Sequence, residues 1–214
     1  MTDAHYHRDG YATFLSLGDR EFRFYGLHPW QASALGEAAL LPLREKISAD
    51  PHVGVGEIGL DRLKEKTISP AQRAAFAAQL EIAAEFGRPV VLHGAKCWGE
   101  VVAACRPYAG RIPAFLFHGF SRSGGLLPDI AALNGFVGVG AALLNDHAVN
   151  YRELVREVPI ERVLVETDAD YGRAAARPSP GEILCKLAEL RGMESAALEA
   201  VVDANAARFV EVLA

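Results

Sequence analysis

The chain has 214 residues, of which 50% are apolar and 23% are charged, and its formal net charge is -5. This composition excludes a long disordered chain and a basic protein that coats nucleic acid, and the length suits one domain over residues 1–214. No apolar run reaches the ~18 residues that cross a bilayer, no signal peptide is visible, and the three cysteines lack metal-ligand spacing, so we expect a reduced, cytoplasmic protein without membrane contact.

Short apolar runs rich in β-branched and aromatic residues alternate along the chain with amphipathic stretches. A very short strand is predicted at 2–5 and a candidate strand at 12–17, and further strands follow at 22–27, 53–57, 89–93, 114–118, 135–139 and 162–166. Helical spacing predicts helices at 34–49, 70–87, 98–108, 125–133, 146–157, 180–191 and 194–213. A serine followed by proline marks the start of two of these helices, at Ser69 and Ser179.

This alternation implies an α/β fold in which helices cover both faces of a parallel sheet. Seven or eight such units would close, or nearly close, a (β/α) barrel of the TIM type. The segment between His7 and Phe22 is too short for two complete βα units. We therefore expect a small or incomplete barrel of seven to eight strands that is simplified near its first two strands.

Metal-binding residue types stand at the ends of several predicted strands. Because parallel barrel strands all end on one face, these side chains could converge there. Four imidazoles and two carboxylates exceed the needs of one tetrahedral ion but suit two divalent ions that share a carboxylate. Such ligands favour zinc, iron, cobalt, nickel or manganese over magnesium alone. The six candidates are His5, His7, Glu57, His93, His118 and Asp168.

Short motifs surround these candidates in a fixed order along the chain. They are D-x-H-x-H at 3–7, G-x-H-P at 26–29, G-E-I-G-L-D at 56–61, Q-x-x-x-F-x-x-Q-L at 72–80 with a histidine strand at 89–93, H-G-F-S at 118–121 and E-T-D at 166–168, followed by Asn205. In this order they resemble the motifs of the TatD family of metal-dependent hydrolases, which have amidohydrolase-type barrels. The segment at 56–61 is the most specific of them.

The resemblance implies a deoxyribonuclease or phosphodiesterase that acts on the ends of single-stranded DNA. It implies that Asp168 is the general base and that the two oxygens of Glu57 bridge the ions. One ion would be held by His5, His7, Glu57 and Asp168, and the other by Glu57, His93 and His118.

Further residues are expected to lie beside the metal ligands or against the substrate: Asp3, His28, Asp61, Lys96, Arg122 and Asp170. Asp3 could orient an imidazole, and Lys96 could replace an arginine that the family commonly carries two residues after the third histidine. Trp30 and Trp98 fit packing in the core or at the rim, with base stacking as the alternative.

The chain departs from the family pattern at several positions. Ala95 occupies the place of the arginine, Gly119 that of a cysteine, Asp170 adds a carboxylate after E-T-D, and the family's basic loop has no counterpart at 172–181. Two alternatives therefore accompany the nuclease hypothesis. One is a two-metal hydrolase of a small amide, ester or lactone, and the other is a metal-stabilised component of a larger assembly. The chain could accordingly be a monomer or have a protein partner.

Overall fold

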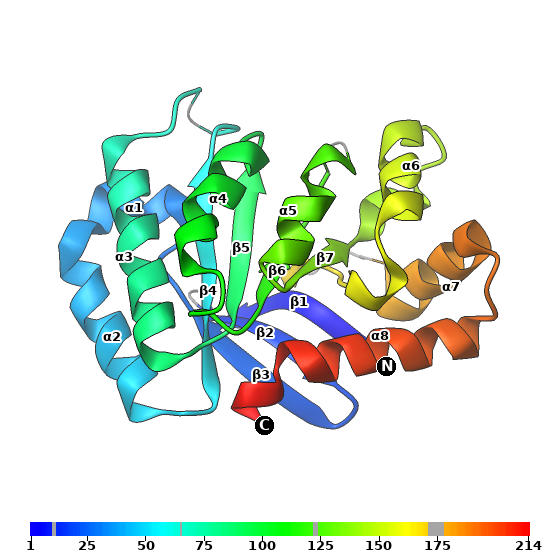
Figure 1. Cartoon of the computed structure of the whole chain (residues 1–214), viewed down its shortest axis with the longest axis horizontal. Coiled ribbons are helices and arrows are strands. Elements are labelled where there is room, and N and C mark those ends of the chain that lie inside the picture. The colour runs from blue at the N-terminus through cyan, green and yellow to red at the C-terminus, as the bar shows by residue number, and fades with distance from the viewer. Residues whose placement is uncertain (10–11, 65, 122–123, 171–177) are drawn as a thin grey trace.

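The computed structural model describes residues 1–9, 12–64, 66–121, 124–170 and 178–214. Within these residues, nine strands form one curled sheet in the order β8-β7-β6-β5-β4-β3-β2-β1-β9. Helices pack around the outside of this sheet (Figure 1). The predicted α/β fold is confirmed.

The strands are β1 (Thr2–Asp9), β2 (Ala12–Leu17), β3 (Arg20–Tyr25), β4 (Val53–Asp61), β5 (Val90–Ala95), β6 (Phe115–Phe117), β7 (Gly135–Val139), β8 (Val163–Val165) and β9 (Ala169–Asp170). The α-helices are α1 (Pro29–Leu35), α2 (Leu40–Ala49), α3 (Pro70–Phe86), α4 (Trp98–Cys105), α5 (Leu127–Ala132), α6 (Val149–Glu157), α7 (Pro180–Arg191) and α8 (Ser195–Phe209).

The first three strands form an antiparallel meander instead of βα units. β2 pairs antiparallel with both β1 and β3, and its residue Thr13 lies opposite His7. β3 then runs parallel to β4, and the remaining neighbours up to β8 are also parallel. A hairpin needs only a tight turn where a parallel crossover needs a helix, which explains the short segment before Phe22. The prediction of a very short first strand is wrong, because β1 has eight residues.

The two ends of the sheet are joined by three residues of the chain. β8 pairs with β7, whereas β9, which begins at Ala169, pairs with β1 next to Tyr6. Between them, the amide of Asp168 donates a hydrogen bond of 2.9 Å to the carbonyl oxygen of His5. Residues 163–170 therefore connect both edges, and the sheet returns to its first strand as a small TIM-type barrel does.

The last helix packs against the end of the barrel at which the parallel strands begin (Figure 1). Phe209 of α8 stacks on Phe24 and contacts Phe136 edge-on, within a cluster of buried residues that the strands supply. The N-terminal ammonium of Met1 pairs with Glu199 of the same helix. This end of the barrel is therefore filled, and the opposite end is left to carry a site.

Local sequence signals place several helix boundaries. Ser69 accepts a hydrogen bond from the Gln72 amide at the start of α3, and Ser179 forms a capping box with Glu182 at the start of α7. The helix expected at 34–49 is instead two helices, because a 3-10 turn that begins at Gly36 separates α1 from α2.

Among the described helices, none has both the length and the apolar character needed to span a bilayer. The three cysteines are free thiols; Cys97 and Cys105 are buried and Cys185 is exposed.

We expect Asn205→Ala to destabilise the fold by about 1–3 kcal/mol. The buried Asn205 amide donates hydrogen bonds to the carbonyl oxygens of Ile160 (2.9 Å) and Val163 (2.8 Å), and the substitution removes both bonds. Urea unfolding measures the effect, with the exposed Ala207→Ser on the same helix as the control. Equal free energies of unfolding for the two variants would show that these bonds do not stabilise α8.

Candidate metal centre

The carboxylate of Glu57 lies at the centre of the candidate site. All nine residues of β4 are buried, and Glu57 itself is only 5% exposed. Its Oε2 lies 3.5 Å from Nε2 of His5 and 3.7 Å from Nε2 of His7. Oδ1 of Asp168, between β8 and β9, lies 3.3 Å from the same nitrogen of His7 and 3.8 Å from that of His5. The two histidines of β1 thus face both Oε2 of Glu57 and Oδ1 of Asp168.

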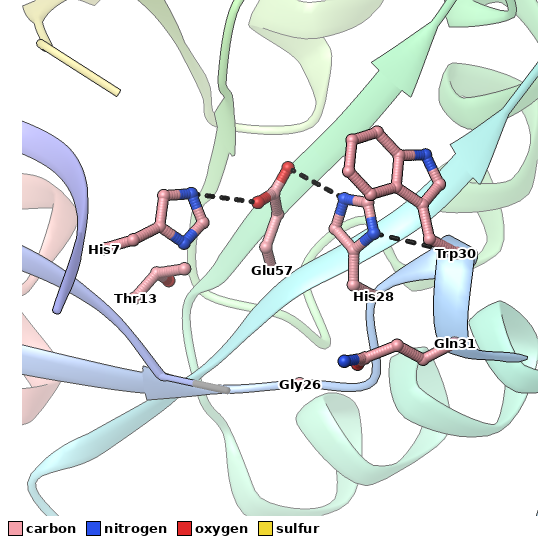
Figure 2. A pocket seen from close by; sticks show the side chains of 7 residues that line it. All are labelled: His7, Thr13, Gly26, His28, Trp30, Gln31 and Glu57. Atoms are coloured by element: carbon pink, nitrogen blue, oxygen red, sulfur yellow. Dashed lines mark hydrogen bonds and ion pairs between the residues drawn. The ribbon is translucent and has the colours of Figure 1, made fainter. Parts of the chain in front are cut away.

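The other carboxylate oxygen of Glu57 faces a second set of imidazoles. Oε1 lies 2.7 Å from Nδ1 of His93, 3.7 Å from Nε2 of His28 and 3.8 Å from Nε2 of His118. Nδ1 of His28 accepts a hydrogen bond from the backbone amide of Trp30, which turns Nε2 toward Glu57 (Figure 2). His28, expected beside the ligands, therefore lies within the cluster itself.

Asp61 supports the second set of imidazoles from the end of β4. Its Oδ2 lies 2.9 Å from Nε2 of His93 and accepts a hydrogen bond of 2.7 Å from the indole nitrogen of Trp30. The backbone amides of Leu63 and Lys64 donate to its Oδ1. The carboxylate of Asp61 therefore orients one imidazole and one indole ring at once.

Glu166 was not among the residues selected from the sequence, yet it holds His118 in place. Its buried Oε1 lies 3.0 Å from Nδ1 of His118 and accepts a hydrogen bond of 2.7 Å from the amide of Gly119. The E-T-D motif contained the signal, because Glu166 lies two residues before Asp168. The neighbouring strand leaves room for this carboxylate at Gly138, where a Cβ would lie 2.0 Å from Oε2 of Glu166.

Asp3 holds the turn that carries Asp168. Its two carboxylate oxygens accept hydrogen bonds from the backbone amide (2.9 Å) and the hydroxyl (2.7 Å) of Thr167. Burial raises the pKa of Asp3 to about 6, although these hydrogen bonds act in the opposite direction. Asp168 follows with a left-handed backbone, φ 51°, a conformation that aspartate tolerates better than most residues.

The carboxylates of the cluster are strongly ionised. Burial acts against the charged form of Glu57, but its interactions with His28, His5 and His93 hold its pKa well below the usual range. Burial likewise opposes the charge of Asp168, whose pKa is nevertheless lowered to about 2, chiefly by the hydrogen bond with His7. Both groups are therefore anions at neutral pH.

The histidines differ in their protonation. Burial lowers the pKa of His5, and the charge of the adjacent His118 lowers it further. Burial also acts to lower the pKa of His118, but the carboxylate of Glu166 and other anions raise it to about 10. His5 is thus held as the neutral imidazole, which is the form that binds metals.

The donor set fits a metal centre. The side chain of His5 is completely buried, and within the described part of the chain both of its ring nitrogens lack a hydrogen-bond partner. Such unpaired buried nitrogens are costly unless a ligand occupies them. The described residues contain three groups in which the donor atoms of the group all lie within 4.8 Å of one another. These groups are His5, His7 and Glu57; His5, His118 and Asp168; and His28, Glu57 and His93.

The remaining predicted residues lie around this cluster. Lys96 follows β5 with a left-handed backbone, φ 57°, and lines a cavity together with His93 and His118. Asp170 lies in β9 opposite His7. Arg122 lies outside the described residues.

A second cavity, of about 180 Å³, has Glu57 in its lining and is distinct from the cavity that Lys96 lines (Figure 2). Its lining includes Thr13, Trp30 and Gln31. Thr13 was not predicted from the sequence, because a parallel strand would bring its last residues, and not its first, to this face. The antiparallel β2 instead brings its first residues to this face of the barrel.

A TIM-type barrel that gathers imidazoles and carboxylates where its parallel strands end belongs to the class of metal-dependent hydrolases. The family model described as TatD related DNase matches residues 3–211. The chain therefore belongs to the TatD related DNase family, and the resemblance that its motifs indicated is confirmed.

Two relatives carry the name 3'-5' ssDNA/RNA exonuclease TatD. The protein from Pectobacterium carotovorum subsp. carotovorum (strain PC1) is 32% identical over 195 residues, which cover 86% of this chain and 75% of that protein. The protein from Klebsiella pneumoniae (strain 342) is 32% identical over 192 residues, which cover 84% and 73%. The crystal structure of YJJV, a TatD homologue from Escherichia coli K12, matches with a TM-score of 0.74 and 23% identity over 87% of this chain and 75% of that one, which shows the shared fold.

We expect Gly138→Ala to lower the affinity for Mn²⁺ by about 10–100-fold, the usual cost of losing a group that orients a metal ligand. The new methyl group would displace the Glu166 carboxylate that holds His118. Calorimetric titration with Mn²⁺ measures the affinity, and Gly140→Ala is the matched control, because a Cβ there would meet Glu166 only at an ordinary 3.6 Å. Unchanged affinity in a folded Gly138→Ala protein would refute this role of Glu166.

Proposed function

We propose that the protein is a metal-dependent phosphodiesterase that cleaves nucleotides from the end of a single strand with two divalent ions. One observation carries the proposal: the two oxygens of the Glu57 carboxylate face two different sets of imidazoles. In this position Glu57 would help to hold both ions. The names of the related TatD exonucleases support a single-stranded nucleic acid as the substrate.

The proposed ligands follow the two sides of Glu57. His5, His7 and Asp168 would hold one ion with Oε2, and His93 and His118 the other with Oε1. His28 lies beside the second position. The imidazole nitrogens and carboxylate oxygens of these residues suit zinc, manganese or a similar ion. Bound ions would polarise the scissile phosphate and lower the pKa of the attacking water.

Asp168 has the position and charge of a general base. Its side chain is 49% exposed at the rim, whereas that of Glu57 is buried. Its carboxylate is an anion at neutral pH and could accept the proton that the attacking water releases. Its placement depends on Thr167, which Asp3 holds in turn.

A reducing compartment such as the cytoplasm suits the three free cysteines. That the protein is a monomer or has a protein partner stays a prediction.

We expect Asp168→Asn to abolish cleavage of end-labelled single-stranded DNA in the presence of Mn²⁺ or Mg²⁺. The amide keeps the size of the side chain but cannot accept the proton, and the loss of a positioned base costs about 10²–10⁴-fold in rate. Gel analysis of wild type and variant, each metal tested separately, measures the effect.

Asp19→Asn, in the exposed turn between β2 and β3, is the matched control and should cleave as wild type does. Undiminished cleavage by Asp168→Asn would overturn the role of this residue. No cleavage of DNA or RNA by the folded, metal-loaded wild type would overturn the nuclease proposal and leave the amide or ester hydrolase.

A further inference from the structure

The cavity on the Thr13 side of Glu57 has a polar floor and an aromatic edge. Its lining residues come from β1, β2, β4, the segment between β3 and α1, and the start of α1 (Figure 2). Its volume of about 180 Å³ is well below the ~300 Å³ at which pockets for small molecules usually begin. It would therefore enclose only part of a bound group and leave the rest at the rim.

The hydroxyl of Thr13 is an unused hydrogen-bonding group at this cavity. Thr13 is 3% exposed, and its Oγ1 has no hydrogen-bond partner among the residues that the structure describes. A buried hydroxyl without a hydrogen-bond partner is costly. Valine has the shape of threonine without the hydroxyl and is common in strands, so valine at this position would avoid that cost. The hydroxyl therefore points to a polar group that enters the cavity.

Trp30 provides a fixed aromatic surface at the rim of the same cavity. The residue is 53% exposed, yet its indole nitrogen is bound to Asp61 and its ring contacts His28 edge-on with centroids 4.7 Å apart. The ammonium group of Lys64 lies 5.0 Å from the ring centroid. An exposed aromatic ring held beside a positive charge is the arrangement on which bases of single strands stack.

We propose that this cavity, the terminal-nucleoside pocket, binds the last nucleoside of the strand, with its base on Trp30 and its sugar hydrogen-bonded to Thr13. The inference rests on the proposed function and adds where the end of the substrate lies. The phosphate that follows the nucleoside then reaches Glu57 and His28, which line the same pocket.

Two chromogenic phosphodiesters with the same leaving group test the pocket: thymidine 5'-p-nitrophenyl phosphate and methyl p-nitrophenyl phosphate. Only the first carries a nucleoside.

Thr13→Val should raise the KM for the thymidine ester by about 2–10-fold, the worth of one hydrogen bond. Trp30→Ala should raise its KM by about 5–100-fold, the worth of one stacked base, and Trp30→Phe should restore most of the affinity. For Thr13→Val, kcat should stay within about two-fold and hydrolysis of the methyl ester should not change. Trp30→Ala also removes the indole group bound to Asp61, so its KM for the thymidine ester should rise by more than its KM for the methyl ester.

Two variants outside the pocket serve as controls: Ser16→Ala on β2 and the exposed Leu41→Ala on α2. Both should match wild type on both esters. If the pocket variants change neither ester, or change both equally, the pocket does not bind the nucleoside and the inference is overturned.

Binding of thymidine separates this inference from the proposed function. Thymidine should quench the fluorescence of the exposed Trp30, since Trp98 is buried, and Thr13→Val should weaken the quenching at least two-fold. If wild type hydrolyses neither ester but shows this quenching, the phosphodiesterase proposal fails and the pocket stands. Absence of quenching overturns the pocket whatever the hydrolysis shows.

Discussion

A carboxylate ion buried in the middle of a sheet is the constraint on which this structure depends. Glu57 is almost inaccessible to solvent, and an uncompensated charge in that position would cost several kcal/mol. The chain compensates it with imidazoles from β1, from the end of β3, from β5 and from the end of β6. The barrel brings these distant segments together because its parallel strands end on one face.

The second layer of the site consists of carboxylates that fix the imidazoles. Asp61 binds His93, and Glu166 binds His118. Each of these carboxylates also accepts backbone hydrogen bonds, so its own position is set by the main chain. Gly59 allows β4 to lie close to β5, since a Cβ there would lie 2.0 Å from the carbonyl oxygen of His93. The geometry of the donors is therefore held by the strands and by these hydrogen bonds.

The antiparallel hairpin changes what the barrel presents at its open end. β2 replaces a βα unit, which shortens the chain and still leaves His5 and His7 on β1. It also runs in the opposite direction to its neighbours, so its first residues, not its last, lie at the site. This reversal places Thr13 opposite His7 and gives the open end a hydroxyl that a parallel strand would not supply there.

The sequence predicted those parts of the site that follow from local pattern. His5, His7, His93 and His118 could be found because each lies in or just after an apolar run and parallel strands end together. The meander could not be predicted, because pairing direction between 2–9 and 12–17 is set by tertiary contacts and not by local propensity. β4 runs four residues beyond Glu57, to Asp61, because its later residues pair with β5. Thr13 and Glu166 were missed because their roles depend on neighbours distant in sequence.

The most direct test of this account is a crystal structure of the Mn²⁺-loaded protein with anomalous scattering collected to locate the ions. The account predicts two ions per chain, about 3.5–4 Å apart, with one oxygen of Glu57 bound to each. One of these ions should contact His5 and His7, and the other His93. A single ion, or two ions that do not share Glu57, would contradict it.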